Sequence, residues 1–437
     1  MPTTLKQPGI TPESFEAFLA TRDEPAWLTE SRRAAWQAFQ DLPLPSRADE
    51  EWMRTDIRLF RLDKFSLPAA AAAETDLPEH ALMGGVQFAG VTAALNSRPV
   101  LTQFRDIALA KQGVLFGSLD ELVRQHSDRV RPHLFRVVNQ RADKFAALHA
   151  ACWSGGFILY VPKGVTIDEP FHMFSAITPG GIDFNHTLVI LEEGASATLL
   201  SETAGGGPDQ QGLHCGAIEL IVGAGAKLRY VNLQNWGTGV WHFAHQKAVV
   251  ERAGQLQWTI GALGSRLAKV NQHVALAGSD ANAQVNGVMF TEGKQHLSYH
   301  TLQHHQAPHC KSDLLYKGAL QDQSRLVWRG MIKVDPGAQK TDGYQRNDNL
   351  MLSDHARADS IPGLEIQADD VRCTHGSTTG RVDDEMIFYA QTRGLTRKEA
   401  TRMVVAGFFQ QVFDRITIES VREALGEAIG RRIREYE

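Results

Sequence analysis

The middle of the chain repeats one loose pattern: EEGASATL (192–199), VGAGAKLRY (222–230), ERAGQLQW (251–258) and AGSDANAQV (277–285). Its central glycines, Gly194, Gly225, Gly254 and Gly278, are separated by 31, 29 and 24 residues. Recurrence at a period of roughly 20–50 residues is typical of stacked structural repeats. The pattern therefore favours a β-solenoid. A large β-sandwich also gives many short strands with turn signals, and it stays open as the alternative.

The segments between these turns read as β-strands. From about residue 143 the periodicity changes from helical to strand-like, and each apolar run ends at Gly, Asp, Asn or Ser: FILYV, HTLVIL, AIELIV, KLRYVNL, LQWTIGAL and RLVWRGMIKV. In a solenoid each coil hydrogen-bonds to the next, so alternate apolar side chains stack inward. We therefore expect a long all-β middle.

Helical patterns flank this middle. Apolar residues from Leu28 to Phe39 recur at helical spacing, and Thr396 with Glu399 forms a capping box ahead of another apolar stripe. We divide the chain into an N-terminal helical region (1–80), a mixed connecting region (81–142), a β-helix core (143–385) and a C-terminal helical region (386–437).

The composition excludes several classes of protein. With 45 basic and 50 acidic residues, the chain has a net charge of -5 and lacks the basic surface that nucleic acid requires. No apolar run reaches the roughly 18–20 residues of a membrane-spanning helix, and the start lacks a signal-peptide core, so we expect a cytoplasmic protein without membrane contact. The 4 cysteines are far apart, which argues against a disulfide framework and a self-sufficient four-thiolate cluster site.

Several catalytic motifs are missing from the sequence. There is no G-x-x-x-x-G-K-[ST], G-x-G-x-x-G, G-x-S-x-G or H-E-x-x-H motif. A role driven by ATP would therefore depend on the nucleotide site of another protein.

Cys373 and His375 form the strongest candidate for a metal-binding pair. If their segment is a strand, both side chains point to one face, where a thiolate and an imidazole would suit iron. Two ligands do not complete a tetrahedral site, so further donors from a partner are needed. Uncompensated charge on Glu365, Asp369 and Asp370 would raise the pKa of the Cys373 thiol. The structural alternative is a buried cysteine beside a hydrogen-bonded histidine.

A second histidine cluster lies between His296 and His309, followed directly by Cys310. On a strand His296, His300 and His304 share one face, which makes a metal patch conceivable. The spacing does not match a zinc site, so we favour hydrogen-bonded imidazoles on a polar face of the solenoid.

Several separated motifs give the chain a family resemblance. PGLEIQADDVRCTHGSTTG (362–380), MIFYAQTRGLTRKEA (386–400) and AGFF (406–409) resemble the C-terminal signature of the SufB/SufD family of iron-sulfur cluster assembly scaffolds. Further similar segments are DKFAALHAACWSGGFILYVPKGVTIDEP (143–170), HHQAPHCKSDLLYKGAL (304–320), EPAWLTESRRAAWQAF (24–39) and EEWMRTDI (50–57). The CTHG form is similar to the SufD branch. The resemblance implies a right-handed parallel β-helix core flanked by helical regions.

The same resemblance implies a function. A SufD-like chain would be a non-catalytic scaffold that pairs with a SufB-like paralogue and a SufC-like ATPase, which would supply ATP hydrolysis. His375, then Cys373, would meet iron or a transient iron-sulfur cluster at the paralogue interface, and reduced FAD would bind the complex. The ATPase would dock on the C-terminal helical region, through Phe408, Phe409, Val412 and Phe413.

Two other functions stay open from the residues. A solenoid enzyme acting on polysaccharide would use acidic residues such as Asp369, Asp370, Asp383 and Asp384. Adjacent Asp residues on a strand point to opposite faces, which does not favour a catalytic dyad. The isolated chain could also form a homodimer through an exposed strand edge.

Overall fold

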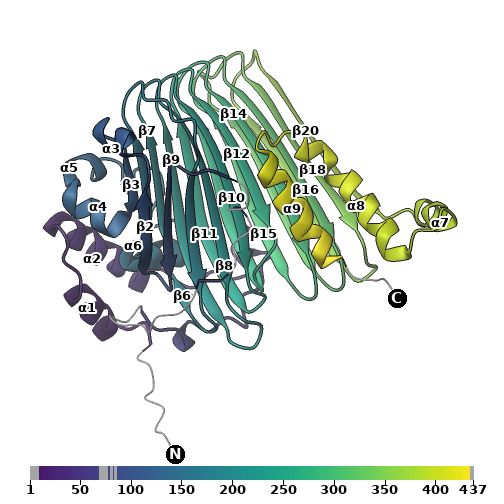
Figure 1. Cartoon of the computed structure of the whole chain (residues 1–437), viewed down its shortest axis with the longest axis horizontal. Coiled ribbons are helices and arrows are strands. Elements are labelled where there is room, and N and C mark those ends of the chain that lie inside the picture. Colours follow the sequence, from purple (N-terminus) through teal and green to yellow (C-terminus); the bar gives the residue numbers. More distant parts are fainter. Residues whose placement is uncertain (1–8, 68–76, 79–81, 83–85, 434–437) are drawn as a thin grey trace, which may run out of the picture.

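The body of the protein is a stack of parallel β-coils. The computed structural model describes residues 9–67, 77–78, 82 and 86–433, so parts of the regions expected to be helical or connecting (1–8, 68–76, 79–81, 83–85 and 434–437) lie outside it. Two long sheets face each other along the stack (Figure 1). From β8 onward, consecutive strands fall in alternate sheets, so each coil contributes one strand to each sheet. The predicted solenoid is confirmed, and the sandwich alternative is wrong.

The first sheet contains ten strands in a continuous order. They are β2 (Pro99–Phe104), β1 (Gly90–Leu95), β5 (Phe171–Ile177), β8 (Ser196–Gly205), β10 (Lys227–Trp236), β12 (Gln255–Ala262), β14 (Asn282–Thr291), β16 (Lys311–Leu320), β18 (Asp342–Met351) and β20 (Arg372–Arg381). Among the described strands of this sheet, only β1 and β2 pair antiparallel. From β10 to β20 the first residues of successive strands are paired, so the coils stack without stagger.

The second sheet lies opposite the first and follows the same progression. Its strands are β19 (Arg357–Ile366), β17 (Arg325–Val334), β15 (His296–His305), β13 (Leu267–Leu276), β11 (Val240–Val250), β9 (Gly212–Val222), β7 (His186–Leu191), β4 (Phe157–Val161) and β3 (Leu115–Ser118), and the short β6 (Ile182–Asp183) pairs with β9. Only β3 and β4 pair antiparallel here.

Each of the four repeated turns contains a residue with a positive φ value, but the residue type differs between the turns. In the first two copies Gly194 and Gly225 take positive φ values of 71° and 65°, a region that favours glycine. In the next two copies the positive φ falls on Ala253 and Asp280, at 56° and 61°. Gly278 is needed for another reason, because a Cβ there would overlap the backbone of the preceding turn. The repeat is therefore one of backbone shape more than of glycine position.

The interior of the solenoid is filled by large side chains on alternate positions of both sheets. Trp258 and Trp328 are 0% exposed, and three tyrosines share this interior: Tyr230, Tyr299 and Tyr316. Side chains at alternate strand positions point to one face, so the observed burial follows the predicted period of two.

Helices cover the N-terminal end of the stack. They are α1 (Pro12–Ala20), α2 (Ala26–Asp41), the short turns η1 (Glu50–Trp52) and η2 (Leu62–Lys64), and then α3 (Ile107–Lys111), α4 (Leu119–Gln125), α5 (Ser127–Val130) and α6 (Lys144–Cys152). Arg32 of α2 is fully buried, with Nε 2.7 Å from a Glu24 oxygen and Nη1 3.0 Å from the Trp153 carbonyl. Because α6 is helical, the strands of the long middle begin at Phe157 and not at about 143 as expected.

Three helices follow the last strand: α7 (Asp384–Thr392), α8 (Arg397–Phe413) and α9 (Glu419–Arg432). Of these, α8 and α9 cover the C-terminal half of the first sheet. The predicted capping box at Thr396 and Glu399 is present at the start of α8. Val421, Leu425 and Ile429 of α9 pack on the outer face of the sheet. In Figure 1, α8 and α9 lie over the strands, whereas α7 extends away from them.

Candidate functional site at the open end of the solenoid

The last coil ends the stack with two free edges. In the described part of the chain, β20 pairs only with β18, and β19 pairs only with β17. An unpaired edge presents a row of backbone donors and acceptors to which another strand can bind. The end of the solenoid therefore offers the backbone of both sheets to a partner.

Cys373 and His375 both lie on the edge strand β20. Their partners in β18 are Gly343 and Gln345, which are buried and face the interior. Because strand side chains alternate, Cys373 and His375 also face the interior side, above the coil below. Cys373 is half-buried, whereas His375 is exposed. The sequence-based expectation that the two residues share a face agrees with this strand.

The thiol of Cys373 is held in its protonated form by its surroundings. Burial raises its pKa above the ordinary value, the Gly343 amide opposes this, and the negative charge of Asp342 adds to the increase. The carboxylates named from the sequence act less directly, since Glu365 is 2.7 Å from the Lys333 ammonium and Asp370 forms an ion pair with Lys340. A bound metal ion would favour the thiolate.

Part of the interior beneath this edge is filled by polar side chains. Gln345 donates from Nε2 to the Gly363 carbonyl at 3.0 Å. Asn349 donates from Nδ2 to Asn347 Oδ1 at 2.8 Å and to Ser360 Oγ at 3.0 Å. Buried polar groups are costly unless they are hydrogen-bonded, so this network keeps the last coils in one arrangement.

The candidate metal site is incomplete within this chain. Among the described residues, no three His, Cys, Asp or Glu side chains converge as a metal site requires. Within the second histidine cluster, His300 is 2.7 Å from Glu51 and His304 is 2.9 Å from Asp335, each through a ring nitrogen and a carboxylate oxygen. This agrees with hydrogen-bonded imidazoles on the outer face of β15 and not with a metal patch.

The structure corrects the residues expected to contact an ATPase. Phe409 and Val412 are 0% exposed and pack on the outer face of the first sheet, and Phe408 and Phe413 are partly buried beside them. These side chains attach α8 to its own solenoid, so Phe409 and Val412 are not available to a partner. Both kinds of contact use apolar residues on a helix, which is why the sequence did not separate them.

A different apolar surface is exposed on the hairpin of α7 and α8. We call it the hairpin surface and define it by four residues with 55% to 68% exposure: Met386, Phe388, Tyr389 and Met403. Only Ile387 and Ala390 of α7 are buried. The segment EMIFYA contains more apolar residues than one helix face can bury, and that excess was the available sequence signal.

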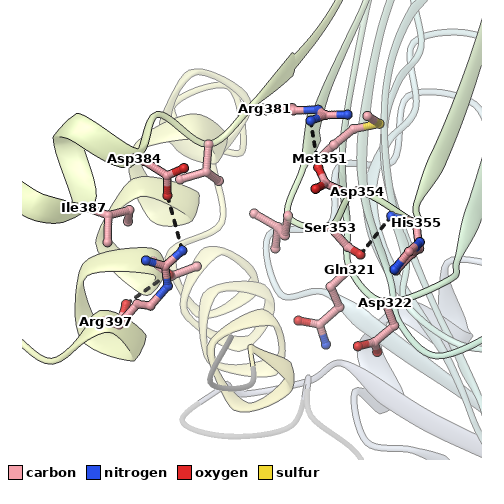
Figure 2. Close-up of a pocket in the computed structure, with 13 residues that line it drawn as sticks. Gln321, Asp322, Met351, Ser353, Asp354, His355, Arg381, Asp384, Ile387 and Arg397 are labelled. Carbon is pink, nitrogen blue, oxygen red and sulfur yellow. Dashed lines mark hydrogen bonds and ion pairs between the residues drawn. The ribbon is translucent and has the colours of Figure 1, made fainter. Parts of the chain in front are cut away.

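A cleft of about 700 Å³ lies between this hairpin and the end of the solenoid (Figure 2). On the solenoid wall Arg381 is 2.7 Å from Asp354, and on the hairpin wall Arg397 is 3.2 Å from Asp384. Each ion pair joins residues of one wall, so these contacts do not tie the hairpin to the solenoid. α7 therefore stands apart from the coils, whereas α8 packs on the first sheet, and the side chains of the hairpin surface stay exposed.

Comparisons with known proteins agree with this architecture. Residues 174–408 match the family model described as "SUF system FeS cluster assembly, SufBD core domain", and residues 15–173 match "SufBD protein N-terminal region". The chain belongs to the SufBD family of the SUF system of iron-sulfur cluster assembly.

Individual relatives are distant but cover nearly the whole chain. The chain is 26% identical to "Iron-sulfur cluster assembly protein SufB" of Bacillus subtilis, over 94% of this chain and 90% of the relative. It is also 26% identical to an "Iron-sulfur cluster assembly SufBD family protein" of Staphylococcus epidermidis, with the same coverage. No helix in the described part of the chain is long and apolar enough to cross a membrane.

Proposed function

We propose that this chain is a non-catalytic, cytoplasmic scaffold subunit of the SUF machinery, of the SufD type. The observation that carries the proposal is the coincidence of the free edges of β19 and β20 with the inward-facing pair Cys373 and His375. An edge that invites a partner and an incomplete ligand set lie in one place. A partner that pairs with the edge can also supply the remaining ligands.

The partner that fits this end is a SufB-like paralogue. A second solenoid with the same strand spacing can extend both sheets by backbone hydrogen bonds, the mode of recognition in which a strand is added to an edge. Iron or a nascent cluster would be the cargo at this junction, with His375 as its first contact and Cys373 as its second. The isolated chain can use the same edges to form a homodimer.

A SufC-like ATPase is the partner we assign to the hairpin surface. Exposed apolar residues on a projecting hairpin favour docking of another protein over contact with water. This assignment replaces the buried residues of α8 and keeps the ATPase within the C-terminal helical region. Reduced FAD stays a proposal for the assembled complex, with no site assigned on this chain.

The polysaccharide-active alternative is not favoured by the acidic residues it would need. Asp383 caps α7 by accepting a hydrogen bond from the Glu385 amide at 2.9 Å, and Asp384 pairs with Arg397. Asp370 pairs with Lys340. Three of the carboxylates are therefore engaged in local structure and do not form the facing pair that glycoside hydrolysis requires.

An affinity purification from native cells tests the proposal. Recovery of a SufB-like paralogue and a SufC-like ATPase supports it, whereas a solitary protein with lyase activity would overturn it. In the recovered complex, His375→Ala should abolish cluster maturation without unfolding the chain, and Thr374→Ala, on the opposite face of β20, should preserve it. Unimpaired maturation with His375→Ala would remove His375 from the site.

A further inference from the structure

The missing side chain of Gly343 leaves a small space inside the solenoid next to Cys373. Gly343 lies in β18 beside Cys373 of β20, and its other neighbour in the sheet is Ser312 of β16. A Cβ at Gly343 would be 3.3 Å from the Cys373 sulfur and 3.5 Å from Nε2 of His305. Because glycine has no Cβ, the thiol and the imidazole border the same space.

His305 reaches this space from the opposite sheet and from two coils away. It is the last residue of β15 and pairs with Val334, which in turn pairs with Ile366 of the last coil. Its side chain is 0% exposed. Without the glycine of the intervening coil, the side chain of β18 would separate His305 from Cys373.

The hydrogen bonding of His305 leaves part of its capacity unused. Nε2 lies 2.8 Å from Ser312 Oγ, whereas Nδ1 is buried and has no hydrogen-bond partner among the described residues. A neutral imidazole is the form that binds metal ions, and a serine hydroxyl can rotate to release a ring nitrogen.

Apolar side chains line the part of this space nearest Cys373. Ile332, Val334 and Ala338 are each 0% exposed and pack together with Cys373, and Ile332 Cγ2 is 3.3 Å from the position of the missing Cβ. Cys373 itself is only half-buried at the open end of the stack. Cys373 is therefore the half-buried end of this arrangement and His305 its fully buried end.

We propose that His305 is an additional, interior ligand for iron that binds at Cys373. The missing side chain of Gly343 leaves room for the metal ion between His305 and Cys373. This inference rests on the proposed function, because it takes Cys373 as a point of iron contact. A thiolate and an imidazole form a donor set that suits Fe²⁺. On binding, the thiol proton leaves to water at the half-buried Cys373. Water or a partner's residues fill the other coordination positions.

Titration of the full-length reduced protein with Co²⁺ alone tests the inference. Cobalt bound to a thiolate gives a near-ultraviolet charge-transfer band, and the other three cysteines are buried, so the band reports on Cys373. We expect the band to be lost in Cys373→Ser. We expect His305→Gln and Gly343→Ala to weaken Co²⁺ binding about tenfold or more.

Two control substitutions separate the site from general effects on the strands. His304→Gln changes the neighbouring histidine, which faces outward to Asp335, and Gly380→Ala adds a methyl group where nothing lies within 4 Å. Both should leave the Co²⁺ affinity unchanged. Gly343→Ala retains every ligand, so it decides the question even if His305→Gln does not fold.

The outcomes distinguish this inference from the proposed function. If the band depends on Cys373 but neither His305→Gln nor Gly343→Ala weakens it, the role of His305 is wrong and the edge site stands. If the unmodified chain shows no Cys373-dependent band, both the interior ligand and Cys373 as an iron contact are wrong. The scaffold role would then be judged by the partners recovered from cells.

Discussion

Phe388 is the residue at which the proposed ATPase contact can be tested most sharply. It is 68% exposed on α7 and belongs to the hairpin surface. A buried aromatic side chain removes about 150–250 Å² from water, so covering the exposed part of Phe388 removes roughly 130 Å². At about 25 cal/mol per Å² this contributes about 3 kcal/mol to docking. Phe388→Ala should therefore weaken the ATPase affinity by about two orders of magnitude.

The assay is calorimetric titration of the purified chain with the ATPase recovered from the same cells. Ile107→Ala is the matched control, because Ile107 is also 68% exposed but lies at the N-terminal end of the solenoid. It should bind the ATPase like the unmodified chain. Thermal denaturation of both variants checks that neither substitution unfolds the protein.

Phe409 distinguishes the two candidate ATPase contacts, which are the apolar residues of α8 named from the sequence and the hairpin surface. It is 0% exposed beneath the helix, so Phe409→Ala should lower the free energy of unfolding by about 3–5 kcal/mol and leave docking of the folded fraction unchanged. Full affinity in Phe388→Ala, together with lost affinity in a folded Phe409→Ala protein, would refute the assignment of the hairpin surface. Full affinity in both variants would place the ATPase elsewhere on the chain.

Three further predictions concern stability. Glu219 is fully buried and accepts three backbone amides of residues 135–138, so Glu219→Gln should lower the free energy of unfolding in urea by about 3–5 kcal/mol; the exposed Glu193→Gln should not change it. The pKa of Glu51 is lowered from 4.5 to about 2, and its hydrogen bond with His300 is the largest cause. Glu51→Gln should therefore cause its full loss in the free energy of unfolding above pH 4.5, and this loss should shrink as the pH falls toward 2. Deleting 414–437 uncovers the sheet beneath α9, and dye binding to exposed apolar surface should increase; unchanged dye binding would contradict the packing of α9.

Local periodicity was enough to predict the coils. Strand alternation gives the inward face of each strand directly, and so it also placed Cys373 and His375 on one side of β20. Turn chemistry was less transferable, because the left-handed position of two turns is occupied by Ala253 and Asp280 and not by glycine. The helix α6 was missed because nearly all of its residues are buried, which removes the amphipathic pattern that identifies a helix.

The relations that depend on contacts across coils could not be predicted. Phe409 and Phe388 are equally apolar in sequence, and only the packing of α8 on the first sheet decides which one is exposed. His305, Gly343 and Cys373 come from three successive coils and both sheets, so no spacing in the sequence indicates that they meet. Their approach depends on the in-register stacking and on one missing side chain.

Within the residues that the structure describes, no strand pairs with the outer edges of β19 and β20, and this also affects how the protein unfolds. In a repeat protein each coil is stabilised mainly by its neighbours, so a terminal coil with one neighbour opens most readily. Amide hydrogens of β20 should therefore exchange with solvent before those of β14, which has neighbours on both sides. Assembly with a partner would slow that exchange. In an unpaired subunit, cellular proteases would cleave the chain preferentially at this locally unfolded end.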